Sequence, residues 1–192
     1  MPFEKRPKLL GEAALFDYAL KTLGARAQST AELRIKLRRK AEKLGDADKV
    51  IARLKEYGYL NDSLFAEQYA ARRLENEGFG RARVLSGLRA KRVAPALAER
   101  AVNAAFAATD ELDLISQFLA RKYRNKPLAE VLADPKGLAA AYRKLRLAGF
   151  SSGNSLRVLK QHAGNEELLD SLESAEELPL AENSHPDDTP SY

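Results

Sequence analysis

The stretch RLKEYGYLNDSLFAEQYA, residues 53–70, places a glycine, two tyrosines and an Asn-Asp pair inside a chain that is otherwise rich in helix-forming residues. Glycine readily adopts the left-handed conformation that ends many helices, so Gly58 predicts a helix C-terminus. Tyr59 then occupies the position at which a Schellman motif places an apolar residue over Leu54. We therefore expect one helix to end at this glycine.

The same stretch also starts a helix. Asn61 is a favoured N-cap, and Asp62 follows in the first turn, where the helix dipole favours a negative charge. Leu60 and Phe65 have the spacing of a hydrophobic staple, which fixes the angle at which the chain enters the helix. The stretch therefore predicts a tight corner between two helices with no linker between them.

Helical periodicity continues through most of the chain, and no alternating Val, Ile and Thr run indicates a strand. Ser29 to Glu32 form a capping box, Asp46 is placed to cap a third helix, and the Asp134–Pro135 pair puts proline at the first helical position. The sequence therefore predicts an all-α fold. We expect helices at about 12–24, 30–44, 47–57, 62–77, 80–92, 95–107, 110–125, 135–148 and 152–163.

Two internal patterns indicate repeats. The motif Leu-x-x-x-Gly-aromatic occurs at 54–59, 74–79 and 145–150, and apolar residues recur 49 positions apart on the first helix of each unit. A period near 50 with three helices per unit predicts three tandem three-helix modules in an elongated array that can curve. We expect modules at 12–59, 60–108 and 109–163, followed by an acidic, largely disordered tail at 164–192.

Composition excludes several classes of protein. The 192 residues include no cysteine, which removes disulfides, thiolate nucleophiles and Cys-based zinc sites and is typical of a cytosolic protein. No apolar run approaches the roughly 18–20 residues of a membrane span, and the first residues lack the apolar core of a secretory signal. We expect a cytoplasmic protein without membrane contact.

Charge is distributed unevenly. The whole chain has a net charge of +5 and a pI near 9.4, yet residues 164–192 hold nine acidic residues and no Lys or Arg. Removing these nine from the 27 acidic residues leaves 18 against 32 Lys and Arg, a net charge of +14 for residues 1–163. Such a charge favours polyanionic partners. The tail either folds back over the basic surface and competes with DNA or is a solubilising disordered end.

Two clusters supply candidate binding residues. In the helix expected at 30–44, four basic residues spaced by three or four positions lie away from an apolar stripe of Leu33, Leu37, Ala41 and Leu44: Lys36, Arg39, Lys40 and Lys43. Seven more lie between 72 and 92: Arg72, Arg73, Arg81, Arg83, Arg89, Lys91 and Arg92. We interpret both clusters as an anion- or partner-binding surface; the alternative is a solvated helix surface.

The sequence offers little for catalysis. His162 and His185 are the only histidines, and the chain has no metalloprotease motif, phosphate-binding glycine loop or nucleophile elbow. Asp110 and Asp113 stand at the start of an expected helix, where a capping role accounts for them. We therefore expect no enzyme activity and no cofactor.

Several segments resemble the RecX family, the bacterial regulators of the RecA recombinase. They are LGARAQSTAELRIKLRRK (23–40), VIARLKEYGYLNDSLFAEQYAARR (50–73), GFGRARVLSGLRAKRV (78–93) and KLRLAGFSSGNSLRVLK (144–160). The Gly-Tyr-Leu-Asn-Asp corner is the most specific match. The family more often has two aspartates there, and Asn61 keeps the capping ability.

The resemblance implies tandem three-helix modules that bind the helical groove of the RecA–DNA filament and restrain its growth, ATP hydrolysis and strand exchange. It implies RecA and, more weakly and with salt dependence, the DNA backbone as partners. We expect the protein to act as a monomer. Two alternatives stay open: a free-standing tri-helical DNA-binding protein, such as a transcription or chromosome-associated factor, and a scaffold whose charges are only solvated.

Overall fold

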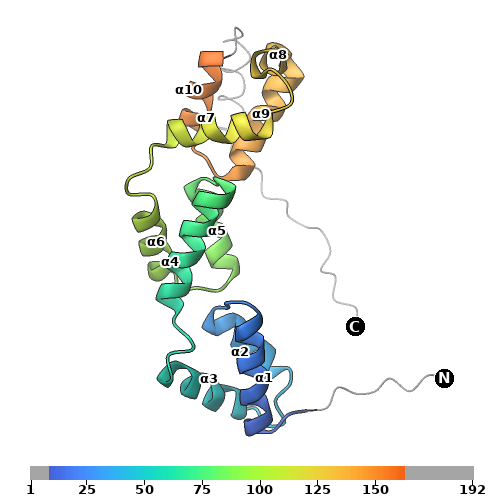
Figure 1. The fold of residues 1–192 in the computed structure, drawn as a ribbon, viewed down its shortest axis with the longest axis vertical. Helices are drawn as coiled ribbons and strands as arrows, with labels where there is room; N and C mark the ends of the chain where they lie inside the picture. The colour runs from blue at the N-terminus through green and yellow to red at the C-terminus, as the bar shows by residue number, and fades with distance from the viewer. Residues whose placement is uncertain (1–8, 163–192) are drawn as a thin grey trace, which may run out of the picture.

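The computed structural model describes residues 9–162 and has an all-α fold, as expected from the sequence (Figure 1). Figure 1 shows an elongated array with α1–α3 at one end, α4–α6 in the middle and α7–α10 at the other end. The division into three modules stays a prediction, and the expected acidic tail lies outside the described residues. In chain order the elements are α1 (Glu12–Ala25), α2 (Thr30–Arg38), α3 (Asp46–Glu56), α4 (Asp62–Arg72), the π-helical η1 (Arg73–Glu77), α5 (Arg81–Ala90), α6 (Pro95–Ala105), α7 (Glu111–Lys122), α8 (Leu128–Ala133), α9 (Pro135–Ala148) and α10 (Ser152–His162).

The corner at 57–64 forms as the sequence predicts. Gly58 has a φ of 76°, and the amide of Tyr59 donates to the carbonyl of Leu54 at 2.8 Å, which is the long hydrogen bond of a Schellman motif. The side chain of Asn61 accepts from the backbone amides of residues 63 and 64 and caps α4. The Tyr59 side chain differs from the expectation, because it is 57% exposed and meets the Tyr57 ring edge-on.

Helix α2 ends at Arg38, so the expectation of a helix to residue 44 is wrong. The chain turns away because its backbone pairs with the segment before α1: the amide of Leu10 donates to the carbonyl of Lys40 at 2.7 Å, and the amide of Glu42 donates to the carbonyl of Leu10 at 2.9 Å. Leu44 consequently lies outside the apolar stripe and is 87% exposed.

Three smaller differences concern helix ends. The N-cap of α3 is Gly45, and the helix begins at Asp46 rather than being capped by it. The expected helix at 62–77 is α-helical to residue 72 and then widens into the π-helix η1. Helix α8 was not expected, because its six residues follow Pro127 without a side-chain cap and are too few to show a periodic pattern.

The buried side chains of the described residues form two hydrophobic clusters. One joins α1, α2 and α3 through residues such as Leu15, Leu33 and Leu54, all fully buried. The other runs without interruption from Ala66 in α4 to Leu159 in α10. Burying one leucine contributes about 1.5–3 kcal/mol, so each cluster stabilises its own set of helices. We refer to residues 12–60 as the α1–α3 unit and to residues 62–162 as the α4–α10 unit.

Inside the α4–α10 unit, two glycine corners pack backbone against backbone. The amide of Gly80 donates to the carbonyl of Ala148 at 2.9 Å, and the amide of Ala82 donates to the carbonyl of Gly149 at 3.2 Å. A Cβ atom on Gly80 would overlap the Gly149 carbonyl, and one on Gly149 would overlap the backbone of residue 83. We call these four residues the glycine seam. Phe150, which follows Gly149, meets Phe118 of α7 edge-on, with ring centres 5.4 Å apart.

The start of α7 is tied to the start of α10 by one carboxylate. Glu111 accepts hydrogen bonds from the amide and hydroxyl of Ser151, at 2.8 and 2.7 Å, and from the Asn154 side chain at 2.6 Å. Partial burial would raise the pKa of Glu111, but these hydrogen bonds outweigh it and hold the pKa below its ordinary value. The charged form therefore stabilises this end of the array.

The α1–α3 unit meets α4 and the end of α5 through polar contacts. The Ser29 hydroxyl donates to the carbonyl of Lys91 at 2.5 Å, and the amide of Thr30 donates to the Asp62 carboxylate at 2.7 Å. The ammonium of Lys91 lies 2.9 Å from Glu32. We call these five residues the polar junction. Only half of the expected capping box forms. The Glu32 amide donates to the Ser29 hydroxyl, but the Glu32 carboxylate accepts from the Lys91 ammonium instead of the Ser29 amide.

Candidate nucleic-acid interface

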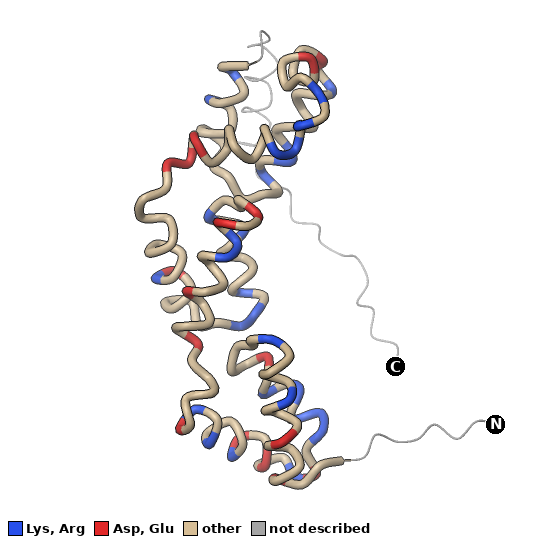
Figure 2. The backbone as a smooth tube through the Cα atoms, in the orientation of Figure 1, with Lys and Arg blue, Asp and Glu red and all other residues tan. Residues whose placement is uncertain are grey.

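Basic residues line the array along its whole length. Figure 2 shows Lys and Arg in the lower, middle and upper parts of the described chain, whereas the connection from α6 to α7 carries acidic residues instead. Asp110 and Glu111 lie there, and Asp110 caps α7 by accepting from the amide of Leu112 at 2.8 Å, as expected. The positive charge is therefore distributed along the molecule. We expect a polyanion to make most contacts where basic side chains line a hollow in the surface.

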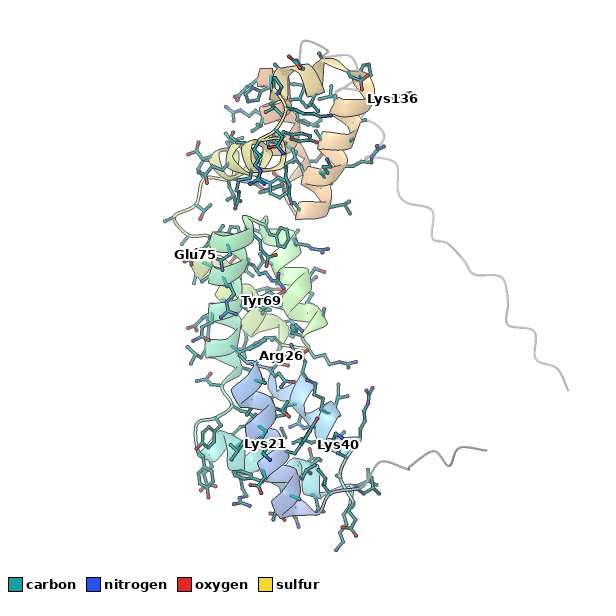
Figure 3. All side chains as sticks on the ribbon, turned by 45° about the vertical axis from the view of Figure 1, so that its right-hand side comes forward. Lys21, Arg26, Lys40, Tyr69, Glu75 and Lys136 are labelled. Atoms are coloured by element: carbon teal, nitrogen blue, oxygen red, sulfur yellow. The ribbon has the colours of Figure 1, made fainter. Side chains whose placement is uncertain are left out.

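One hollow of about 310 Å³ lies where the loop after α1 faces α4. Figure 3 places Arg26 at the end of the α1–α3 unit and Tyr69 next to it on α4. Arg26 and Arg72 are exposed, so both guanidinium groups can reach a ligand from opposite walls. The hollow is lined by Arg26, Ala27, Phe65, Gln68, Tyr69, Arg72, Arg73, Glu77 and Lys91.

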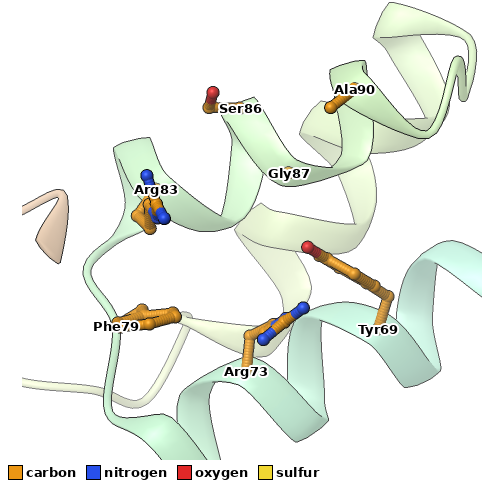
Figure 4. A pocket seen from close by; sticks show the side chains of 7 residues that line it. All are labelled: Tyr69, Arg73, Phe79, Arg83, Ser86, Gly87 and Ala90. Atoms are coloured by element: carbon orange, nitrogen blue, oxygen red, sulfur yellow. The ribbon is translucent and has the colours of Figure 1, made fainter.

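A second hollow of about 230 Å³ lies between the end of α4, η1 and α5 (Figure 4). Its lining residues are Tyr69, Arg73, Phe79, Arg83, Ser86, Gly87 and Ala90. Tyr69 and Arg73 line both hollows, which therefore adjoin along α4. We call the two together the α4 groove.

The groove depends on close packing around Tyr69. A Cβ atom on Gly87 would overlap the Tyr69 hydroxyl, so glycine allows this ring to reach across to α5 (Figure 4). Arg73 lies over the Tyr69 ring at 5.0 Å and pairs with Glu77. Partial burial would lower the pKa of Arg73, but its hydrogen bonds to Tyr69 and Glu77 raise it above its ordinary value. Arg73 is therefore permanently charged and held in place.

The structure brings together four of the seven basic residues predicted between 72 and 92. Arg72, Arg73, Arg83 and Lys91 line the α4 groove. Arg83 is exposed and lies over the Phe79 ring at 5.7 Å, whereas Lys91 is bonded to Glu32.

The other three lie elsewhere. Arg81 bonds to the Asn103 side chain and lies over Phe106, and Arg89 approaches Glu99 at 3.9 Å, so both belong to the α5–α6 side. Arg92 is exposed in the turn after α5.

The four basic residues predicted near α2 do not form one helical ridge, because α2 ends at Arg38. Lys36 is on the helix and bonds to the Gln28 side chain. Lys40 lies over the Tyr18 ring at 5.0 Å, and Arg39 and Lys43 are exposed in the turn that follows. These four side chains contribute to the basic surface, but they do not lie on one face of a helix as their spacing predicts.

Sequence reasoning missed Arg26 as a lining residue. It directly follows the C-terminus of α1, and it faces the groove only because the polar junction brings the two units together. Nothing in its local pattern indicates that contact.

The groove is suited to binding anions. Arginine offers a planar fork of donors that matches phosphate oxygens, and aromatic rings beside it limit its hydration. Among residues 9–162, no group of three or more His, Asp or Glu side chains is arranged to hold a metal ion. No helix in the same range is long and apolar enough to span a bilayer.

The chain is 34% identical over 151 residues to the regulatory protein RecX of Deinococcus radiodurans, an alignment that covers 78% of this chain and 69% of the relative. The chain belongs to the RecX family. It is also 33% identical over 133 residues to the regulatory protein RecX of Trichlorobacter lovleyi, covering 69% of this chain and 80% of that relative.

The family model described as RecX, second three-helix domain, matches residues 61–102, which include α4, η1 and α5 around the groove. A crystal structure of RecX from Lactobacillus salivarius superposes with a TM-score of 0.52 at 18% identity, covering 87% of this chain and 97% of that one. Another crystal structure of a regulatory protein RecX gives a TM-score of 0.59 at 17% identity, covering 78% and 71%. Both confirm the helical fold, and membership of the family assigns the chain a regulatory role.

Proposed function

We propose that this protein is a non-enzymatic regulator that binds the RecA–DNA filament and inhibits its extension, ATP hydrolysis and strand exchange, thereby modulating recombination and DNA repair. The observation that carries the proposal is the α4 groove, which is lined by arginines and, apart from Arg26 and Ala27, lies within the segment that the RecX family model matches. DNA backbone phosphates along the groove would meet Arg72 in one hollow and Arg83 in the other.

The shape of the molecule supports the same function. An elongated array can contact several recombinase protomers along a filament while its groove meets the DNA, whereas a compact enzyme would bury its ligand in one pocket (Figure 1). Arg39, Lys43 and Arg92 extend the exposed basic surface beyond the groove. We propose that the protein acts as a cytoplasmic monomer and needs no cofactor.

Inhibition of the single-strand-dependent ATPase of RecA from the same organism tests the proposal, with RecA in excess. We expect suppression at well below one molecule per RecA protomer, because a filament regulator acts on many protomers at once. The double variant Arg72→Glu/Arg83→Glu should lose most of this inhibition. A control with the same charge change is Lys21→Glu/Lys55→Glu, whose positions are exposed and do not line the groove.

The same titration separates the two competing functions. If hydrolysis falls only when the protein saturates the DNA, a free-standing DNA-binding protein explains the data better, and tight, sequence-selective binding to bare duplex would support that reading. If the protein binds no DNA even at low salt, the basic surface is only solvated charge.

A further inference from the structure

A carboxylate of the protein itself, Glu32, contacts two of the cations at one end of the α4 groove. Glu32 is only 18% exposed, and its Oε1 atom lies 2.9 Å from the Lys91 ammonium and 3.9 Å from the Arg26 guanidinium. Both cations line the hollow between the loop after α1 and α4. Glu32 therefore holds two of the charges that an incoming anion would use.

The same carboxylate helps to join the two units. The hydrophobic clusters of the α1–α3 unit and the α4–α10 unit are separate, and the polar junction links the two units in addition to the corner at 57–64. Its other links are the hydrogen bonds of Ser29 to the Lys91 carbonyl and of Thr30 to Asp62. Among the described residues, the buried Thr30 hydroxyl and the second carboxylate oxygen of Glu32 have no hydrogen-bond partner. The junction is thus incompletely satisfied.

We propose that this end of the α4 groove is a phosphate site for nucleic acid, and that a backbone phosphate bound there takes Arg26 and Lys91 from Glu32 and loosens the α1–α3 unit from the α4–α10 unit. The proposal rests on the proposed function for the source of the phosphate. Two anions on the same pair of cations repel each other, and a half-buried carboxylate that has lost its partner is costly to keep. Separation of the units returns Glu32 to water.

A nucleic acid fits this site better than an isolated anion. The groove continues from Arg26 and Arg72 to Arg73 and Arg83, so a strand can place successive phosphates along it. Each added phosphate contact strengthens binding and makes it more sensitive to salt. A free phosphate ion gains only one such contact.

Glu32 and phosphate compete for Arg26 and Lys91, and such coupling is reciprocal. Weakening the contacts of Glu32 with these two cations must therefore strengthen the binding of phosphate. The variant Glu32→Gln keeps the size and polarity of the side chain but removes its charge. We expect it to bind a single-stranded oligonucleotide about fivefold more tightly than the natural chain at low salt. Glu75→Gln is the matched control, since it makes the same change in net charge at an exposed position of η1 that does not line the groove (Figure 3).

The distance between the units gives the second measurement. The chain has no cysteine, so Ala52→Cys on α3 and Ala96→Cys on α6, both exposed, can carry a pair of spin labels in the full-length protein. We expect one narrow distance distribution without ligand and a broader, longer one when oligo-dT is added. In the labelled Glu32→Gln variant the broad distribution should be present before any ligand is added.

Several results would overturn the inference. They are equal oligonucleotide affinity for Glu32→Gln and Glu75→Gln, an unchanged distance on binding, and an equal opening by inorganic phosphate or by a poly-glutamate peptide at matched charge concentration. ATPase inhibition is read separately. If the protein inhibits the ATPase but the distance does not change, the filament role stands and the response of the junction is rejected. If the distance changes on binding but the ATPase is not inhibited, only the filament role is rejected.

Discussion

The substitution Gly149→Ala tests how firmly the glycine seam holds the α4–α10 unit together. Residue 149 has a φ of 89°, where an L-residue costs about 1–2 kcal/mol. The new Cβ would also overlap the backbone of residue 83 and push the seam apart. Losing the two hydrogen bonds of the seam adds about 1–3 kcal/mol. We therefore expect a destabilisation of about 2–5 kcal/mol.

Two other glycines separate these contributions. Gly58 also has a positive φ, of 76°, but a Cβ there would meet nothing within 4 Å, so Gly58→Ala should cost only about 1–2 kcal/mol. Gly80 has an ordinary φ of −73°, so Gly80→Ala should cost only the seam contribution of about 1–3 kcal/mol. The double variant Gly80→Ala/Gly149→Ala should cost less than the sum, because the seam can be lost only once.

Urea unfolding followed by far-ultraviolet circular dichroism measures the totals, and hydrogen exchange read by mass spectrometry assigns each loss to its helices. Gly149→Ala should increase exchange in α5 and α9 and leave α1–α3 unchanged. If Gly149→Ala costs no more than Gly58→Ala, or if exchange rises equally in all helices, the reasoning about the seam is wrong.

Three further predictions concern a cap, a carboxylate and the groove. Asn61→Ala removes the side-chain cap of α4 and should lower stability by about 1 kcal/mol, measured by urea unfolding, with faster exchange at the first turn of α4. The lowered pKa of Glu111 means that its contribution to stability is complete above its ordinary pKa near 4.5 and is lost as the pH falls through the lower folded-state value. Glu111→Gln should therefore flatten the fall in stability between pH 6 and pH 3 seen by acid titration of thermal unfolding; an unchanged profile would assign that fall to other carboxylates. Arg72→Glu should weaken oligonucleotide binding and lower the slope of log affinity against log salt by about 1, measured by fluorescence anisotropy, whereas Lys21→Glu should leave the slope nearly unchanged.

The parts of the fold that depend on local chemistry could be predicted from the sequence. The helix end at Gly58 and the caps at Asn61 and Asp134 involve hydrogen bonds within a few residues, and each forms as its residue type indicates. The all-α fold follows from the same local signals.

The parts that depend on distant contacts could not. Helix α2 ends early because Leu10 supplies backbone hydrogen bonds to residues 40 and 42, a pairing that no local pattern encodes. The recurring Gly-aromatic motif was visible as a stop signal, but its role in packing the corner at 78–80 against the corner at 149–150 depends on tertiary structure.

The candidate site divides in the same way. Clustering in the sequence found Arg72, Arg73 and Arg83, because neighbours on one helix or on two consecutive helices stay close in space. It did not separate them from Arg81 and Arg89, which face α6, because the orientation of α5 is set by packing against α4 and α6.

The glycine seam makes the α4–α10 unit rigid, so we expect bending to occur between this unit and the α1–α3 unit. With α5 bonded to α9 through backbone atoms, we expect α4–α10 to turn as one rigid body about a pivot formed by the corner at 57–64 and the adjoining polar junction. A rotation of about 10° at that pivot, carried over roughly two helix lengths of about 20 Å each, moves the far end by about 7 Å. A change in a few polar contacts would thereby move α10 by more than the pitch of one α-helical turn, which is about 5.4 Å.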